Sequence, residues 1–202
     1  MKKIVAVLLT LLISCSLSVS RAQSKFGFGL KGGVNLASQS TTGEGLNVNV
    51  ESILRFHGGA YMHYFMLDKI AIQPELIISG KGSKWDDPYT NTGDLLTYID
   101  MPLLIRFQPL RMINIHAGTQ FAYLLSAFQD DISGDEKIDI KDWYNKAEIG
   151  IALGAEANMP FNINITLRYI IGLSEASNEV HYIDPWKNRF IQASIGYRFM
   201  GK

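Results

Sequence analysis

The sequence predicts an all-β fold, an eight-stranded antiparallel up-and-down transmembrane β-barrel. From about residue 25 onward, eight segments alternate apolar and polar side chains with a period of two, which is typical of strands whose two faces meet different surroundings. The connections between these segments alternate along the chain between long polar loops and turns of only a few residues. Outer-membrane barrels combine these two features, because their strands face lipid on one side and a polar interior on the other.

Residues 1–22 have the features of a signal peptide. Two lysines precede an apolar stretch at residues 4–13, and Ser20-Arg21-Ala22 places small residues where a signal peptidase reads them. Cleavage after Ala22 would leave residues 23–202 as the barrel domain, exported to the outer membrane of a Gram-negative envelope. An alternative stays open, because the residues before Cys15 resemble a lipobox, which would make this cysteine a lipidated amino terminus.

Charge and composition exclude some function classes. The whole chain has 19 basic and 19 acidic side chains, and residues 1–22 contain three basic and no acidic ones, so the remainder has a net charge of −3. A nucleic-acid partner is not expected, because such partners require a basic patch. The hydrophobic fraction of 47% is ordinary, as expected for a barrel that carries its membrane signal in alternate positions rather than in long apolar runs.

The eight strands are expected at about residues 25–37, 52–65, 70–82, 95–107, 112–126, 144–157, 162–173 and 187–199. Each has one apolar face that would contact lipid. In chain order, this face is represented by Leu30, Met62, Ile72, Leu103, Ile115, Leu153, Leu167 and Ile195. The opposite, lumen face is represented in the same order by Lys31, His57, Glu75, Asp100, His116, Glu156, Arg168 and Arg198.

The connections orient the barrel, because short turns of outer-membrane barrels face the periplasm and long loops face outside. The short turns are expected at 66–69, 108–111 and 158–161, and the long loops at 39–51, 84–94, 127–143 and 174–186. The three tryptophans fall where strands meet long loops, which predicts an outer aromatic girdle made of Trp85, Trp143 and Trp186. A soluble carrier barrel is the alternative, but its charged face would have to point outward.

Two prolines interrupt the strand pattern. Pro74 and Pro102 each remove a backbone donor inside a strand, and a closed barrel has no edge for them, so local bulges are expected at both. The strands around them resemble the PorT-like outer-membrane β-barrel proteins, a family of small OmpA/OmpX-type barrels. The motifs that carry this resemblance are Ile72-Gln73-Pro74-Glu75-Leu76, Tyr98-Ile99-Asp100-Met101-Pro102-Leu103-Leu104-Ile105-Arg106-Phe107, Gly118-Thr119-Gln120-Phe121-Ala122-Tyr123-Leu124-Leu125-Ser126 and Ile195-Gly196-Tyr197-Arg198-Phe199. The resemblance implies an integral outer-membrane barrel and allows a role as an accessory of an envelope secretion or assembly machine.

The lumen face carries many charged side chains of both signs. An eight-stranded barrel is just wide enough for side chains to fill, and buried ions must be compensated, so these residues are expected to pair and to close the interior. The predicted lumen network consists of Arg55, Glu75, Asp100, Arg106, Glu148, Glu156, Arg168 and Arg198, with Lys81 and Lys146 also assigned to the inward face. A narrow channel or ion path is the alternative interpretation.

Catalytic, metal and cofactor sites are not expected. The lumen-facing histidines, His57, His63 and His116, are scattered, and the acidic segment 130–136 lacks the full spacing of a calcium-binding loop. We therefore expect a non-enzymatic barrel with a structural or surface-interaction role, and a lipid-modifying barrel enzyme remains a second alternative. The expected partners are outer-membrane lipids, the barrel-assembly machinery during biogenesis, and an envelope or extracellular protein bound through the loops.

Overall fold

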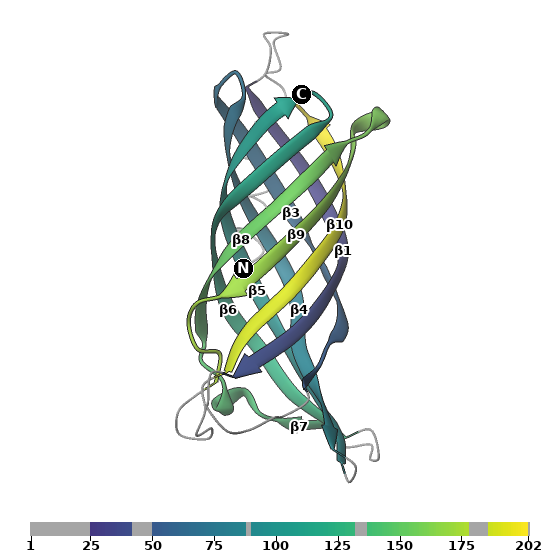
Figure 1. Ribbon diagram of the computed structural model, residues 1–202, viewed down its shortest axis with the longest axis vertical. Helices are drawn as coiled ribbons and strands as arrows, with labels where there is room; N and C mark the ends of the chain where they lie inside the picture. The colour runs from purple at the N-terminus through teal and green to yellow at the C-terminus, as the bar shows by residue number, and fades with distance from the viewer. Residues whose placement is uncertain (1–24, 42–49, 88–89, 132–136, 178–185, 202) are drawn as a thin grey trace, which may run out of the picture.

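The computed structural model describes residues 25–41, 50–87, 90–131, 137–177 and 186–201, which form one closed antiparallel barrel (Figure 1). The predicted signal peptide, which includes Cys15, lies outside the described residues. The eight long strands are β1 (Phe26–Thr41), β3 (Ile53–Leu67), β4 (Ile70–Asp87), β5 (Thr90–Leu110), β6 (Ile113–Asp131), β8 (Ala147–Asn158), β9 (Ile163–Gly172) and β10 (Trp186–Met200). Each pairs with its neighbours in chain order, and β1 pairs with β10 to close the barrel. The predicted eight-stranded up-and-down barrel is confirmed.

The strands tilt strongly around the barrel axis (Figure 1). A row of paired residues that starts at Gly27 of β1 returns to the same strand at Ala37, a stagger of ten residues. The row passes through His63, Gln73, Leu104, Gly118, Ala152, Ile170 and Phe190, where the step from His63 to Gln73 follows the register of the β3–β4 pairs on either side of it. For eight strands this stagger corresponds to a tilt of about 40°, and the resulting interior is narrow enough for side chains to fill.

The two faces of the wall alternate as the sequence pattern predicts. On β9, for example, Asn164, Thr166 and Arg168 are buried inside the barrel, whereas Ile165 and Leu167 are exposed on its outer surface. The exposed apolar side chains continue around the wall, and this outer surface is suited to lipid. The buried core therefore lies in the lumen and consists of polar networks together with apolar clusters.

No helix among the described residues is long and apolar enough to cross a membrane.

The two ends of the barrel differ. At the turn end, β3 and β4 are joined by Asp68 and Lys69, β5 and β6 by Arg111 and Met112, and β8 and β9 through the short 3-10 helix η2 (Pro160–Asn162). At the loop end, two short strands, β2 (Val50–Glu51) and β7 (Lys137–Asp139), pair with β4 and β6, and the 3-10 helix η1 (Lys141–Trp143) follows β7.

The loops expected at 84–94 and 127–143 are wrong in extent, because strand pairing continues into them. β4 and β5 stay paired as far as Asp87 and Thr90, and β6 continues to Asp131 before β7 returns beside it. Alternation is a weak signal here because these segments leave the membrane, so their outward positions need not be apolar.

The bulges expected at Pro74 and Pro102 are also wrong. The pairing of β4 with β5 keeps one register on both sides of Pro74, and the pairing of β5 with β6 does so on both sides of Pro102. The ladder between β3 and β4 is instead interrupted opposite Pro74, between the pairs Tyr61–Glu75 and Tyr64–Ile72. The missing backbone N–H of Pro74 thus interrupts the strand pairing locally, but no extra residue is inserted as it would be in a bulge. The register shifts of the β5–β6 ladder lie elsewhere, at Thr97/Tyr98 and Phe107/Leu110.

Candidate functional site

The middle of the lumen is organised around the carboxylate of Glu75 on β4. Arg168 of β9 binds it with two nitrogens, each 2.9 Å from one carboxylate oxygen, and the Lys31 ammonium of β1 lies 2.7 Å from Oε2. Gln73 donates a further hydrogen bond of 2.8 Å to Oε1. All of these side chains are buried. One carboxylate therefore joins three strands of the barrel, and it compensates two buried cations.

A second group lies nearer the turn end and is connected to the first through Gln73. The Arg106 guanidinium donates to the Gln73 side-chain oxygen at 3.0 Å and lies 2.8 Å from Oε1 of Glu156. Asn114 and Thr166 also donate to the Glu156 carboxylate, at 3.2 and 3.3 Å. The polar contacts thus run without a break from the middle of the barrel to its turn end.

A third group lies towards the loop end and surrounds Lys81 of β4. The Lys81 ammonium is 2.9 Å from Asp100 and 3.9 Å from Glu148, and it stands 4.2 Å from the centre of the Tyr98 ring. Tyr98 and Asn188 both donate hydrogen bonds to Glu148. One ammonium therefore bridges two carboxylates from different strands, and the polar neighbours satisfy the remaining oxygens of Glu148.

Six of the eight residues predicted for the lumen network are fully buried in these three groups. Arg55 and Arg198 are instead only half-buried, and Lys146, also assigned inward, is exposed just before the start of β8. The predicted network did not include Lys31, although the sequence pattern places it on the lumen face, nor Tyr98, which shares strand parity with Asp100 and could have been found from that parity.

The three lumen histidines pack among these groups. His57 Nε2 lies 2.8 Å from the Ser194 hydroxyl, and His116 Nε2 accepts a hydrogen bond of 3.1 Å from Arg168. The His116 ring lies over Gly154, where a Cβ atom would come within 2.6 Å of Nε2, so this close approach requires glycine. Among the described residues, no three His, Cys, Asp or Glu side chains gather as a metal site. The arrangement positions histidines as packed structural groups.

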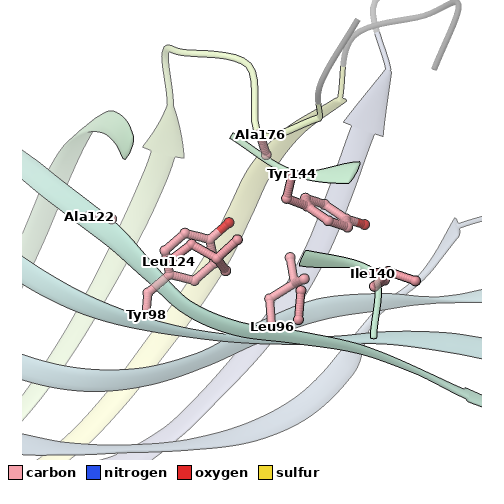
Figure 2. Close-up of a cluster of buried hydrophobic side chains, with 8 residues drawn as sticks. Leu96, Tyr98, Ala122, Leu124, Ile140, Tyr144 and Ala176 are labelled. Atoms are coloured by element: carbon pink, nitrogen blue, oxygen red, sulfur yellow. The ribbon is translucent and has the colours of Figure 1, made fainter. Parts of the chain in front are cut away.

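The segment after β7 folds back over the loop end of the lumen (Figure 2). Ile140 and Tyr144 pack against Leu96 and Leu124 of the wall, and Tyr144 donates a hydrogen bond to the Asp94 carboxylate. The remaining members of this buried cluster are Tyr98, Ala122, Ala127 and Ala176. An apolar layer therefore covers the third polar group from the loop side.

This inward packing contradicts the predicted outer aromatic girdle. Trp186 starts β10 on an inward position and is 6% exposed, and Trp143 is half-buried against the cluster in Figure 2. The Trp85 side chain lies outside the described part of the structure. Trp143 and Trp186 therefore pack towards the interior, where the fold-back segment and the start of β10 are buried.

Buried side chains fill the lumen where the three polar groups lie. A cavity beside Lys81, Glu148 and Asn188 measures only about 10 Å³, close to the space that one water molecule occupies. Paired charges and bulky side chains occupy the interior above and below it.

We therefore expect the reconstituted protein to show no steady conductance of porin size in planar bilayers. A 16-stranded porin in the same bilayers serves as the positive control. Regular, large single-channel steps from the purified chain would show that the interior opens, and would contradict this prediction.

At the loop end the strands continue into a sheet extension, which consists of residues 84–87 of β4, 90–93 of β5 and 128–131 of β6 together with β2 and β7. The barrel pairing of β6 with β8 ends at Tyr123, yet β6 stays paired with β5 and β7 beyond that point. β5 has 21 residues, about twice the 9–11 that cross a bilayer. The extension projects past the rest of the barrel in Figure 1. The wall thus continues as a paired sheet beyond the length of strand that a bilayer requires.

Comparisons with known proteins agree with this architecture. A protein-family model described as outer membrane protein beta-barrel domain matches residues 21–178. No curated protein sequence matches the chain.

Several solved structures share the fold. Ail, the attachment invasion locus protein of Yersinia pestis, solved in complex with the heparin analogue sucrose octasulfate, is 12% identical with a TM-score of 0.53, covering 86% of this chain and 99% of Ail. Neisserial surface protein A is 12% identical with a TM-score of 0.53, over 87% of this chain and 98% of that protein. OprG from Pseudomonas aeruginosa is 11% identical with a TM-score of 0.50, over 89% and 98%. At these identities the likeness concerns the fold alone.

Proposed function

Because the chain belongs to the outer membrane protein beta-barrel domain family, we propose that it is a non-conducting, non-enzymatic surface-interaction protein of the outer membrane. Its contact surface is the sheet extension at the loop end. The observation that carries this proposal is the continued pairing of β4, β5 and β6 beyond the barrel wall. A sheet held by backbone hydrogen bonds presents a fixed surface, and rigid scaffolds commonly carry function on the segments that they project.

The interior supports a scaffold role rather than a transport or catalytic role. The charged side chains of each polar group form ion pairs across the lumen, and the apolar fold-back at Ile140 and Tyr144 covers the group nearest the loop end. His57 and His116 are engaged with Ser194 and Arg168 and are buried, so they are poorly placed to act on a lipid substrate at the rim. A barrel closed in this way can act as a scaffold that holds its outer segments in place.

Biogenesis and finer family placement extend the proposal. Residues 1–22 act as a cleaved signal peptide, and the barrel-assembly machinery inserts residues 23–202 through the last strand, which ends near the aromatic Phe199. The Pro74 and Pro102 motifs support a PorT-like member of the family. Such a member could instead serve an envelope secretion or assembly machine, which would contact the periplasmic turns.

The test shortens the extension at positions where the structure allows clean closure. Phe128 and Asp139 are paired across β6 and β7, and Lys84 is paired with Gly93 across β4 and β5. A two-residue turn can therefore replace residues 129–138, and another can replace residues 85–92, with the barrel wall intact. Both variants should keep the heat-modifiable, protease-resistant barrel. They should lose co-purified partners at least about tenfold after mild detergent extraction.

Two matched variants decide between the surviving readings. Lys69→Ala with Arg111→Ala alters the turn end, and His57→Gln with His116→Gln alters the lumen. If the turn variant alone loses the partners, the protein is docked from within the envelope and the surface proposal fails. If the wild-type protein modifies outer-membrane lipid and only the histidine variant loses this activity, the enzyme alternative is correct. Partners that survive in every variant would also contradict the proposal.

A further inference from the structure

The lipid-facing row of β10 ends in two cations. From the turn end, this row carries Phe199, Tyr197, Ile195, Ala193 and Ile191, all exposed on the outer wall. The next residues on the same face are Arg189, which is exposed, and Lys187, which is half-buried. Because side chains of a strand alternate, both cations point to the side of the wall that faces lipid rather than into the lumen.

Their level along the barrel corresponds to the edge of the apolar belt. Arg189 pairs with Ile171 of β9 on one side and with Ser38 of β1 on the other. On the β1 side the outward apolar row ends with Leu36, which pairs with Ile191, so a polar side chain takes its place at the level of Arg189. Two residues of a strand tilted by about 40° advance about 5 Å along the barrel axis. Arg189 therefore lies about one headgroup layer beyond Ile191, on the loop side, which faces the outer leaflet.

Neither cation is committed to an acidic partner within the described residues. The buried cations Lys31, Lys81, Arg106 and Arg168 all form ion pairs in the lumen, whereas Arg189 and Lys187 form none among the described side chains. Two outward-facing positive charges two residues apart on one strand, next to an apolar wall, present an attractive field to an anion at the membrane surface.

We propose that Arg189 and Lys187 bind the phosphate group of an outer-leaflet lipid. The planar guanidinium of Arg189 can donate two parallel hydrogen bonds to phosphate oxygens, and the Lys187 ammonium adds a second charge from the loop side. The acyl chains of the same lipid would lie against the apolar row that continues to Ile191 and Ile195. This site is independent of the sheet extension and of any protein partner.

The test measures lipid retention by the purified full chain in phosphatidylcholine nanodiscs that contain a small fraction of diphosphorylated lipid A. Native mass spectrometry should detect retained lipid A on the wild-type protein and much less of the enzymatically dephosphorylated form. Each charge removed should weaken retention about fivefold, so Arg189→Gln with Lys187→Gln should lose roughly 25-fold. Arg189→Lys with Lys187→Arg should retain the lipid.

A control variant distinguishes lipid binding at Arg189 and Lys187 from a general effect of the protein's positive charge. Lys69→Gln with Arg111→Gln removes the same charge at the turn end and should leave retention unchanged, and a heat-modifiability assay confirms that every variant is folded. Equal loss in both double variants, or equal retention of the two lipid A forms, would overturn the proposal. Displacement of the lipid by millimolar inorganic phosphate would show that the residues bind free phosphate instead, which would also overturn it.

Discussion

Replacing Glu75 with glutamine is expected to lower the free energy of unfolding by about 3–5 kcal/mol. The isosteric change keeps the shape of the side chain but removes the charge that compensates Lys31 and both nitrogens of Arg168. These two cations would then remain buried without a counterion, which is far more costly than losing a hydrogen bond between neutral groups. Urea titration of the protein in lipid vesicles measures the difference.

Two variants test the cause of this loss. Glu51→Gln makes the same chemical change at an exposed position of β2 and should alter stability by less than about 1 kcal/mol. Adding Lys31→Met to Glu75→Gln removes one of the stranded cations and should recover part of the loss. If the double variant is less stable than Glu75→Gln alone, charge compensation at Glu75 is not the source of the effect.

Replacing Leu103 with lysine is expected to destabilise the barrel by about 2–4 kcal/mol. Leu103 lies on the outer face of β5 in the middle of an apolar row that runs from Ile99 to Phe107, so a lysine there would carry its charge into the hydrocarbon layer. A urea titration of the reconstituted protein, in which the folded fraction is read from its heat-modifiable gel mobility, measures the loss in free energy of unfolding.

Ile138 provides the matched control for the lipid-facing assignment. It is an exposed apolar residue as well, 54% against 44% for Leu103, but it belongs to β7 on the sheet extension. A lysine at Ile138 should face water and cost less than about 0.5 kcal/mol. Equal losses at the two positions would mean that the outer wall does not face lipid at the level of Leu103.

The polar lumen shows how much of the candidate site could be predicted from the sequence. Alternation assigned Glu75, Arg106 and Arg168 to the inward face because a strand has a period of two, and the structure places them there. The partners could not be assigned in the same way. Arg168 binds Glu75 from the opposite side of the barrel, and Lys81 lies between Asp100 and Glu148. These contacts form because the stagger of ten residues decides which residues of different strands lie at the same height in the lumen. The stagger arises when the sheet closes into a barrel, so it cannot be predicted from the side-chain pattern of a single strand.

By itself, the amino-acid sequence determined the number of long strands, their order and which face most side chains take along the wall, because these follow from local periodicity and from the length of the connections. The tertiary structure alone decided what happens at the loop end. Trp186 turns inward, Ile140 and Tyr144 fold back over the lumen, and β4 to β6 continue past the wall. At that end the surrounding medium changes from lipid to water, so the apolar-outward rule stops applying. Packing between segments that are distant in sequence then decides where each side chain lies.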